Sequence, residues 1–262
     1  GKHYVGAVAG FNQEWYTYRY TGAKAQGILT PNIPVINATT GNQYAYDSAE
    51  HWAIRGAFAR VNYIFNDRYL FEFNGRYDGT SRFRKEDRFK FFPSFSAGWR
   101  VSEESFIKNN LTWLDNLKLR ASWGSLGNQN VSNYAYIPEY GSVGFVNWDM
   151  GGSRPMGISP SGLISPNLTW ETATTIDFGI DVALLGNRLD FTFDWYSRRT
   201  KDILMAGDKY PSVLGASAPK KNSGILRTNG WELSLKWKDR LANGINYDVS
   251  FVDRKSTRLN SS

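Results

Sequence analysis

The residues of this chain that could perform acid–base or nucleophilic chemistry are few. His3 and His51 are the only two histidines, and both fall near the beginnings of predicted strands. A serine nucleophile needs a base within hydrogen-bonding reach, and no nucleophile motif accompanies either histidine. Glu103 and Glu104 are adjacent carboxylates, but they follow Ser102, the expected cap of a short helical turn, where the helix dipole favours acids. The sequence therefore predicts no catalytic residue and no enzyme activity.

Four further carboxylates share one face of a predicted hairpin: Asp177, Asp181, Asp190 and Asp194. They could bind a metal ion, but we favour a wall that faces water, on which they pair with nearby Arg or Lys. The chain has no cysteine, which excludes disulfides and thiolate metal sites. It also lacks a glycine-rich phosphate loop and any Cys/His metal-ligand spacing. We therefore predict neither a bound metal nor a cofactor.

Aromatic side chains in a long irregular segment are better candidates for binding. Residues 127–170 show no clear period, and they hold Tyr140, Phe145, Trp148 and Trp170. Aromatic rings stack on sugars and also hold peptides, so these four residues are candidate substrate-binding residues. The alternative is a loop that packs on its own side chains. The sequence leaves both interpretations open.

The elements that must position this segment are strands. Tyr69–Val101 is typical of two long strands joined by a polar loop: Phe71 and Phe73 share one face of the first, and Glu72 and Asn74 share the other. Successive strand side chains point to opposite faces, so each strand has an apolar and a polar face. The same alternation predicts about nine strands, at roughly 3–16, 51–65, 69–78, 88–101, 117–124, 176–184, 189–196, 231–238 and 245–251.

The two faces should meet different surroundings. If the strands cross a bilayer, the apolar face contacts lipid and the polar face lines the lumen. The residues expected to face lipid are Phe71, Phe73, Phe91, Phe95, Ile176, Phe178, Phe191, Phe193, Leu233 and Leu235. The residues expected to face the lumen are Glu72, Arg76, Arg100, Arg120, Asp177, Asp194 and Glu232.

The connections between the predicted strands alternate in length. Long ones are expected at 17–50, 79–87, 127–170 and 205–227, and short ones at 66–68, 102–115, 186–187 and 239–243. Outer-membrane barrels have this asymmetry, whereas nothing makes a soluble β-sandwich place its long loops at one end, and its strands are usually shorter. The pattern predicts an all-β fold, a partial antiparallel up-and-down transmembrane β-barrel. The alternative of a different class is a soluble or surface β-sandwich binding module.

Composition adds two exclusions. The net charge of the 262-residue chain is +7, which raises nucleic acid as a partner. The basic residues are spread along the strands and mixed with acids, as in the run Arg84–Arg88, so we predict no nucleic acid binding. No apolar run approaches the roughly 18–20 residues of a membrane helix.

Several motifs together resemble the barrel of SusC/RagA-type TonB-linked outer-membrane transporters. Their order and spacing match over most of residues 1–252, which makes the resemblance more specific than any one motif. The motifs are Asp78–Phe83, Phe92–Arg100, Leu117–Gly124, Gly127–Gln129, Asn167–Glu171, Asn187–Leu189, Tyr196 with Thr200–Asp202, and Asn229–Leu233.

The resemblance implies part of a 22-stranded barrel with a plugged lumen. It also implies a TonB-dependent importer of oligosaccharides or peptides in the cell outer membrane, surrounded by lipid and covered by a SusD-like surface lipoprotein. The plug domain, the region that contacts TonB and the terminal barrel strand are not recognisable here. A passive porin is the alternative of similar fold.

The domain organisation follows from the same pattern. Residues 1–252 are expected to be a fragment of the barrel domain. From Asp253 to Ser262 the alternation stops, and this basic tail resembles translated cloning or adapter sequence. We therefore expect residues 253–262 to be non-native.

Overall fold

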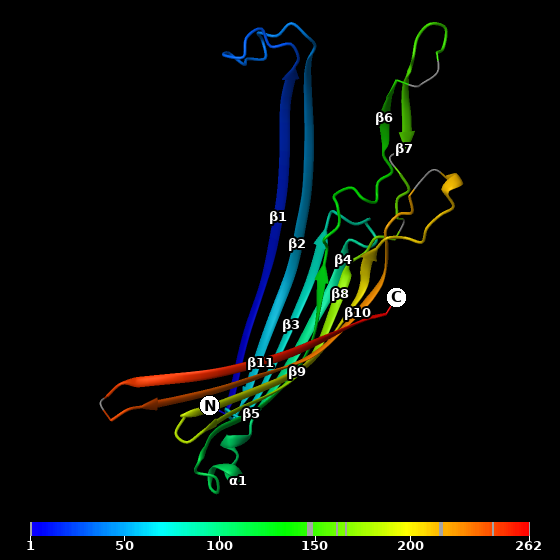
Figure 1. The fold of residues 1–262 in the computed structure, drawn as a ribbon. Helices are drawn as coiled ribbons and strands as arrows, with labels where there is room; N and C mark the ends of the chain where they lie inside the picture. Colours follow the sequence, from blue (N-terminus) through cyan, green and yellow to red (C-terminus); the bar gives the residue numbers. More distant parts are fainter. Residues whose placement is uncertain are drawn as a thin grey trace.

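The computed structural model describes residues 2–145, 149–160, 162–165, 167–214, 217–242 and 244–261. Its main feature is one nine-stranded antiparallel sheet in which neighbours along the chain are neighbours in space, except where β5 pairs with β8 (Figure 1). This up-and-down order confirms the predicted all-β architecture. The strands of the sheet are β1 (His3–Ala25), β2 (Gln43–Phe65), β3 (Tyr69–Thr80), β4 (Phe89–Arg100), β5 (Leu114–Asn128), β8 (Glu171–Leu184), β9 (Leu189–Met205), β10 (Lys221–Arg240) and β11 (Asn246–Ser261).

The connections lie at two ends of the sheet, as their lengths predict. The long ones, between β1 and β2, β3 and β4, β5 and β8, and β9 and β10, all lie at one end (Figure 1). We call this the loop end and the opposite one the turn end. The turn end carries the helical segments η1 (Val101–Glu103) and α1 (Ser105–Lys108). No helix within the described ranges is long and apolar enough to cross a membrane.

Three of the predicted loops are shorter than expected because strands extend into them. β1 and β2 pair without interruption from His3 opposite Phe65 to Ala25 opposite Gln43, so the loop predicted at 17–50 is wrong and only 26–42 connect them. The extension is rich in Tyr and Thr, which favour strands without supplying the apolar alternation sought in the sequence. The segment 127–170 contains a second sheet, β6 (Tyr140–Phe145) with β7 (Met156–Pro160), and β10 begins at Lys221 instead of after residue 227.

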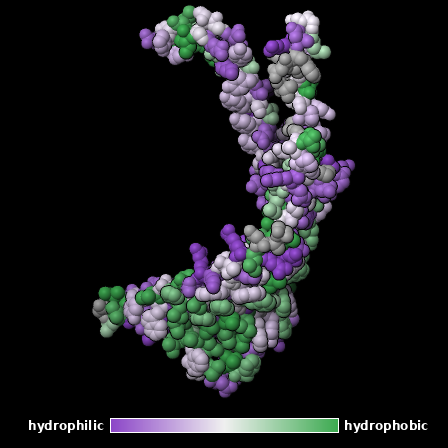
Figure 2. Space-filling view, turned by 45° about the vertical axis from the view of Figure 1, so that its right-hand side comes forward, coloured by the Kyte–Doolittle hydropathy of each residue, from purple (hydrophilic) through white to green (hydrophobic). Residues whose placement is uncertain are grey.

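The register of the sheet confirms the division into an apolar and a polar face. Phe73 lies opposite Phe95, Phe95 opposite Trp123, and Trp123 opposite Ile176. The rings of Phe73 and Phe95 are 5.0 Å apart between centroids. All ten residues expected to face lipid fall on this face, and the seven expected to face the lumen fall on the other. Figure 2 shows a broad apolar surface over the lower part of the sheet, with hydrophilic residues gathered toward the loop end.

Two of the tight turns adopt the backbone conformation that their sequences predict. Asn66 and Asp67 have φ angles of 54° and 55°, and Gly186 and Asn187 have φ angles of 69° and 59°. Two consecutive left-handed residues match the right-handed twist of the strands that they join. Glycine, asparagine and aspartate adopt this conformation at low cost. The tight turn predicted at Asn66–Asp67 is confirmed, whereas the turn predicted at 186–187 is longer than expected: Leu185 also has a positive φ, of 59°, and residues 185–188 connect Leu184 to Leu189.

The connection between β4 and β5 differs from its prediction, which placed it at 102–115 with Ser102 as a helix cap. Ser102 does not cap a helix: it lies buried in η1, and Glu104 occupies the position before α1. The carboxylate of Glu104 instead accepts hydrogen bonds from the Tyr69 hydroxyl at 2.7 Å and the Trp99 indole at 3.1 Å. These donors, with Arg68 at 3.0 Å, lower the pKa of Glu104. The turn is therefore fastened to the ends of β3 and β4 through a carboxylate.

The basic tail lies within β11, whose pairing with β10 runs from Asn246 opposite Arg240 to Ser261 opposite Ile225. This register places Asp253 opposite Leu233, and Lys255 opposite Trp231, on the apolar face. These charged side chains break the alternation of apolar and polar faces along β11. The non-native origin of residues 253–262 stays a prediction.

Candidate functional site

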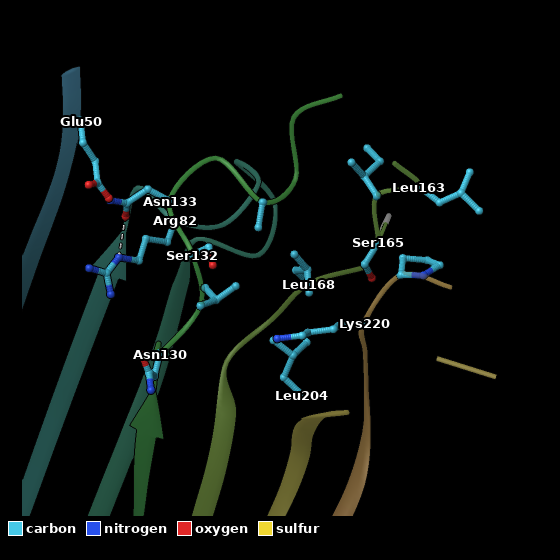
Figure 3. Close-up of a pocket in the computed structure, with 14 residues that line it drawn as sticks. Glu50, Arg82, Asn130, Ser132, Asn133, Leu163, Ser165, Leu168, Leu204 and Lys220 are labelled. Carbon is cyan, nitrogen blue, oxygen red and sulfur yellow. Dashed lines mark hydrogen bonds between the residues drawn. The ribbon is translucent and has the colours of Figure 1, made fainter. Parts of the chain in front are cut away.

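A cavity of about 430 Å³ lies at the loop end of the sheet (Figure 3). Four parts of the chain that are distant in sequence meet around it: the first part of β2, the β3–β4 loop, both ends of the segment 129–170, and the end of β9 with the β9–β10 loop. Its walls are polar and its floor is apolar. The lining residues are Glu50, Arg82, Asn130, Val131, Ser132, Asn133, Ala135, Leu163, Ile164, Ser165, Leu168, Leu204, Pro219 and Lys220.

One wall is a chain of hydrogen bonds between two oppositely charged residues. Arg82 Nε donates to Asn133 Oδ1 at 2.8 Å, and Asn133 Nδ2 donates to Glu50 Oε1 (Figure 3). The Arg82 guanidinium also lies over the ring of Trp52, 5.1 Å from its centroid. These contacts use the planar guanidinium for both hydrogen bonding and stacking. They fix the β3–β4 loop and the segment after β5 against β2.

The opposite wall contains a cation that the protein leaves free. Lys220 extends from the β9–β10 loop into the cavity (Figure 3) and makes no hydrogen bond or ion pair within the part of the chain that the structure describes. Its neighbour Lys221 is engaged instead, at 2.6 Å from Asp208, and this ion pair lowers the pKa of the Asp208 carboxyl. The cavity thus offers a carboxylate, two cations, amides and hydroxyls to a polar molecule.

A hydrophobic cluster beneath the cavity holds the loops in place. Phe83, Phe92, Leu168 and Trp170 are each at most 5% exposed, and Val131, Ala135 and Leu204 pack against them. The Trp170 ring lies 5.5 Å from the ring of Phe83 and 5.4 Å from that of Phe92 between centroids. Its indole N–H donates to the Arg88 carbonyl at 3.1 Å. This cluster gives the cavity a floor that is packed like a protein core.

Two polar side chains fasten the loops at the rim of the same cluster. Asn222 exchanges hydrogen bonds with the backbone of Thr169, at 3.1 and 3.0 Å, and donates to the Asp202 carbonyl at 2.7 Å. Glu171 accepts from the Leu204 amide at 3.0 Å and from the Asn128 side chain at 2.8 Å. Backbone groups of the β5–β8 connection and of the end of β9 are therefore satisfied by side chains, which makes the site rigid.

The structure does not bring the four predicted binding residues together. Tyr140 begins β6 opposite Pro160 and is 75% exposed. Phe145 ends β6 opposite Met156, and Trp148 lies outside the described residues. Trp170 is 3% exposed in the hydrophobic cluster, so its faces are covered by other side chains and are closed to a ligand. For Trp170 the structure favours the alternative of a loop that packs on its own side chains.

The residues that line the cavity were not found by sequence reasoning. Arg82 lies within the motif Asp78–Phe83, so its place in that motif was a signal. Glu50 and Asn133 are 83 residues apart in sequence and carry no motif. Lys220 belongs to a loop with no predicted structure. Only the fold brings them together.

Three of the four carboxylates predicted to line the polar face, Asp181, Asp190 and Asp194, pair with basic residues, which agrees with the favoured interpretation. Arg120 contacts Asp181 at 2.8 Å and Asp194 at 2.9 Å, and Lys238 pairs with Asp190. The described residues hold no group of three or more His, Cys, Asp or Glu side chains that could bind a metal ion. The two histidines contact tyrosines: His3 Nδ1 lies 2.9 Å from the Tyr63 hydroxyl, and His51 Nδ1 lies 2.8 Å from that of Tyr134.

Comparison with known proteins gives matches along the whole chain. Residues 1–262 match the profile described as "TonB dependent receptor-like, beta-barrel". The chain is 36% identical over 202 residues to the TonB-dependent receptor SusC of Bacteroides thetaiotaomicron, which covers 74% of this chain and 19% of SusC. It is 30% identical over 253 residues to the TonB-dependent receptor P3 of Formosa agariphila, or 96% of this chain and 25% of the relative.

Solved structures agree with the sequence matches. All of the chain superposes on 28% of a chain in the RagAB peptide importer in its open-open state, with a TM-score of 0.86 and 25% identity. A second structure, of the RagAB peptide transporter, gives the same TM-score over 99% of this chain. The chain thus spans about a fifth to a quarter of the curated relatives it matches.

Proposed function

Because this chain belongs to the TonB-dependent receptor β-barrel family, we propose that it is part of an outer-membrane importer of nutrients. In this proposal the apolar face contacts lipid, the polar face lines the lumen, and the loop end is extracellular. Transport is driven through TonB, and a SusD-like surface lipoprotein covers the loop end. The cargo is an oligosaccharide or a peptide.

One observation carries the proposal more than any other: the whole chain superposes on a segment of a peptide importer with a TM-score of 0.86. The physical properties of the sheet support it. One continuous sheet of nine strands has a single apolar face, and no second sheet within the described residues packs against it, so the β-sandwich alternative is wrong. A soluble protein rarely exposes so large an apolar surface.

We also propose that the cargo or the lipoprotein contacts the loop end at two places. The first is the cavity, where Lys220 and Glu50 offer opposite charges. The second is the β6–β7 hairpin, where Tyr140 exposes three quarters of its surface and where the sequence places Phe145 and Trp148. An exposed aromatic residue in a hairpin of a long loop suits stacking on a sugar or a peptide, since large aromatic rings dominate interface energetics.

The Lys220→Gln variant tests the cavity. We expect it to weaken uptake of the cognate nutrient by about tenfold in apparent affinity, because a charge-assisted hydrogen bond contributes about 1.5–3 kcal/mol. Folding should be unaffected, since Lys220 has no partner within the described part of the protein. The measurement is uptake of the labelled nutrient by cells that carry the full-length receptor.

Lys209→Gln is the matched control, because Lys209 is exposed in the same loop and does not line the cavity. The double variant Tyr140→Ala/Trp148→Ala provides a second arm, directed at the hairpin. Equal uptake by Lys220→Gln and Lys209→Gln would show that the cargo does not contact Lys220 in the cavity. Unchanged uptake by the double variant would remove the hairpin.

A further inference from the structure

Two arginines lie directly opposite each other on the apolar face near the loop end. Arg199 of β9 pairs with Arg227 of β10 in the same register that places Trp195 opposite Trp231 and Phe193 opposite Leu233. Directly opposite residues of an antiparallel pair point to the same face, so both arginines leave the sheet on its apolar side. Like charges at opposed positions destabilise a sheet. A third cation, Lys201, follows on the same face of β9.

Nothing in the described part of the protein neutralises these charges. Arg199, Arg227 and Lys201 form no ion pair there, and the Nε atom of Arg199 is buried without a hydrogen-bond partner. Their neighbours on this face are neutral: Thr174 lies opposite Arg199, Thr172 opposite Lys201, and Asn229 opposite Ser197. A buried donor left unbonded costs about 1–3 kcal/mol. The cluster of Arg199, Arg227 and Lys201 therefore lacks an anion that would neutralise its charge.

The position of the cluster along the strand matches the edge of a bilayer. On β9 the apolar face runs from Leu189 through Trp195, and Arg199 lies ten residues beyond Leu189. At about 3.3 Å per residue and a tilt of roughly 40°, this separation is about 25 Å along the membrane normal. That is the usual height of the apolar band of such a barrel. Two tryptophans, Trp195 and Trp231, lie on the same face beyond the Ser197–Asn229 pair, and aromatic residues of this kind mark a membrane interface.

We propose that Arg199 and Arg227, with Lys201 beside them, bind the phosphate of an anionic lipid in the outer leaflet. The acyl chains of this lipid lie along the apolar band formed by Phe193, Trp195 and Trp231. Two guanidinium groups provide the planar, paired donors that phosphate accepts best. The phosphate supplies the missing partner of Arg199 Nε and separates the two like charges. The site is distinct from the loop-end cavity and independent of the imported cargo.

The test compares lipid retention by variants of the full-length receptor. The double variant Arg199→Gln/Arg227→Gln removes both guanidinium groups. The control Arg198→Gln/Arg240→Gln removes the same charge from the same two strands on the opposite face. Each detergent-solubilised protein is titrated with diphosphorylated lipid A, with lipid A lacking both phosphates, and with inorganic phosphate. Native mass spectrometry measures how much of each ligand is bound.

We expect the first double variant to bind diphosphorylated lipid A about tenfold more weakly or worse, and the control to bind it like the unmodified receptor. Arg199→Lys/Arg227→Lys should recover part of the affinity. The dephosphorylated lipid should bind the unmodified receptor as weakly as diphosphorylated lipid A binds the first double variant. Equal losses in both double variants, no loss in the first, or competition by inorganic phosphate at the same concentration as the lipid would overturn the proposal.

Discussion

Replacing Trp170 by alanine should loosen the loop end of the sheet. The Trp170 ring is 3% exposed between Phe83 and Phe92, and truncating a buried Trp or Phe to alanine costs about 3–5 kcal/mol. We expect the β3–β4 and β5–β8 connections, which the ring joins, to lose stability. The membrane-facing part of the sheet should keep its stability. Hydrogen exchange of the amides in residues 81–88, measured in the full-length receptor, reports this opening.

Two variants separate packing from hydrogen bonding at this position. Trp170→Phe keeps most of the apolar ring and loses the bond to the Arg88 carbonyl. That carbonyl also accepts from the Thr80 amide at 3.2 Å, so the expected cost is only about 1 kcal/mol. Tyr140→Ala, at an exposed aromatic residue, should change stability by less than about 0.5 kcal/mol. Unchanged exchange in Trp170→Ala would contradict the cluster as the support of the cavity.

Replacing Phe193 by arginine should destabilise the barrel in a lipid bilayer by about 2–4 kcal/mol, because a charge would face hydrocarbon near the middle of the membrane. Phe193 lies between Ile180 and Leu233 in the register, so neither neighbour could pair with the new charge. The measurement is the free energy of unfolding of the full-length receptor in vesicles, from urea titration.

Thr192→Arg is the matched control. Thr192 is the preceding residue of the same strand, on the opposite face, opposite Asp181. An arginine there meets water and a carboxylate, and we expect a change of less than about 1 kcal/mol. Asp194 would be a poorer control, because its carboxylate already contacts Arg120 at 2.9 Å. Equal destabilisation by both arginines would show that the assignment of the two faces is wrong.

The two faces of the sheet could be predicted from sequence, whereas the candidate site could not. The side chains of a strand alternate with a period of two, so the faces of Phe193 and Asp194 can be predicted from the neighbouring residues in the sequence. The ends of β1 and β2 were missed because Tyr18 and Tyr20 lie beyond the apolar band, where both faces meet water and the alternation fades. Trp170 was misread because an aromatic residue in a segment without a period gives no sign of whether it is buried.

The cavity depends on contacts between distant parts of the chain. Glu50 and Asn133, 83 residues apart, meet because β2 extends past the band and the segment after β5 folds back against it. No local propensity encodes that contact. The proposed lipid site shows the reverse situation: Arg199 and Arg227 interrupt an alternation that is otherwise regular, and the register alone shows that they face each other.

The most direct test of the proposed import is the side of the membrane on which the loop end lies. Gly152 follows β6 with a φ of 87°, and no atom outside the two adjacent residues lies within 4 Å of the position that a Cβ would occupy, so a short epitope inserted there should not disturb the fold. In intact cells that express the full-length receptor, we predict that an impermeant antibody labels this epitope fully. Labelling only after the outer membrane has been broken would place the loop end inside the cell envelope and contradict the orientation on which the proposed import depends.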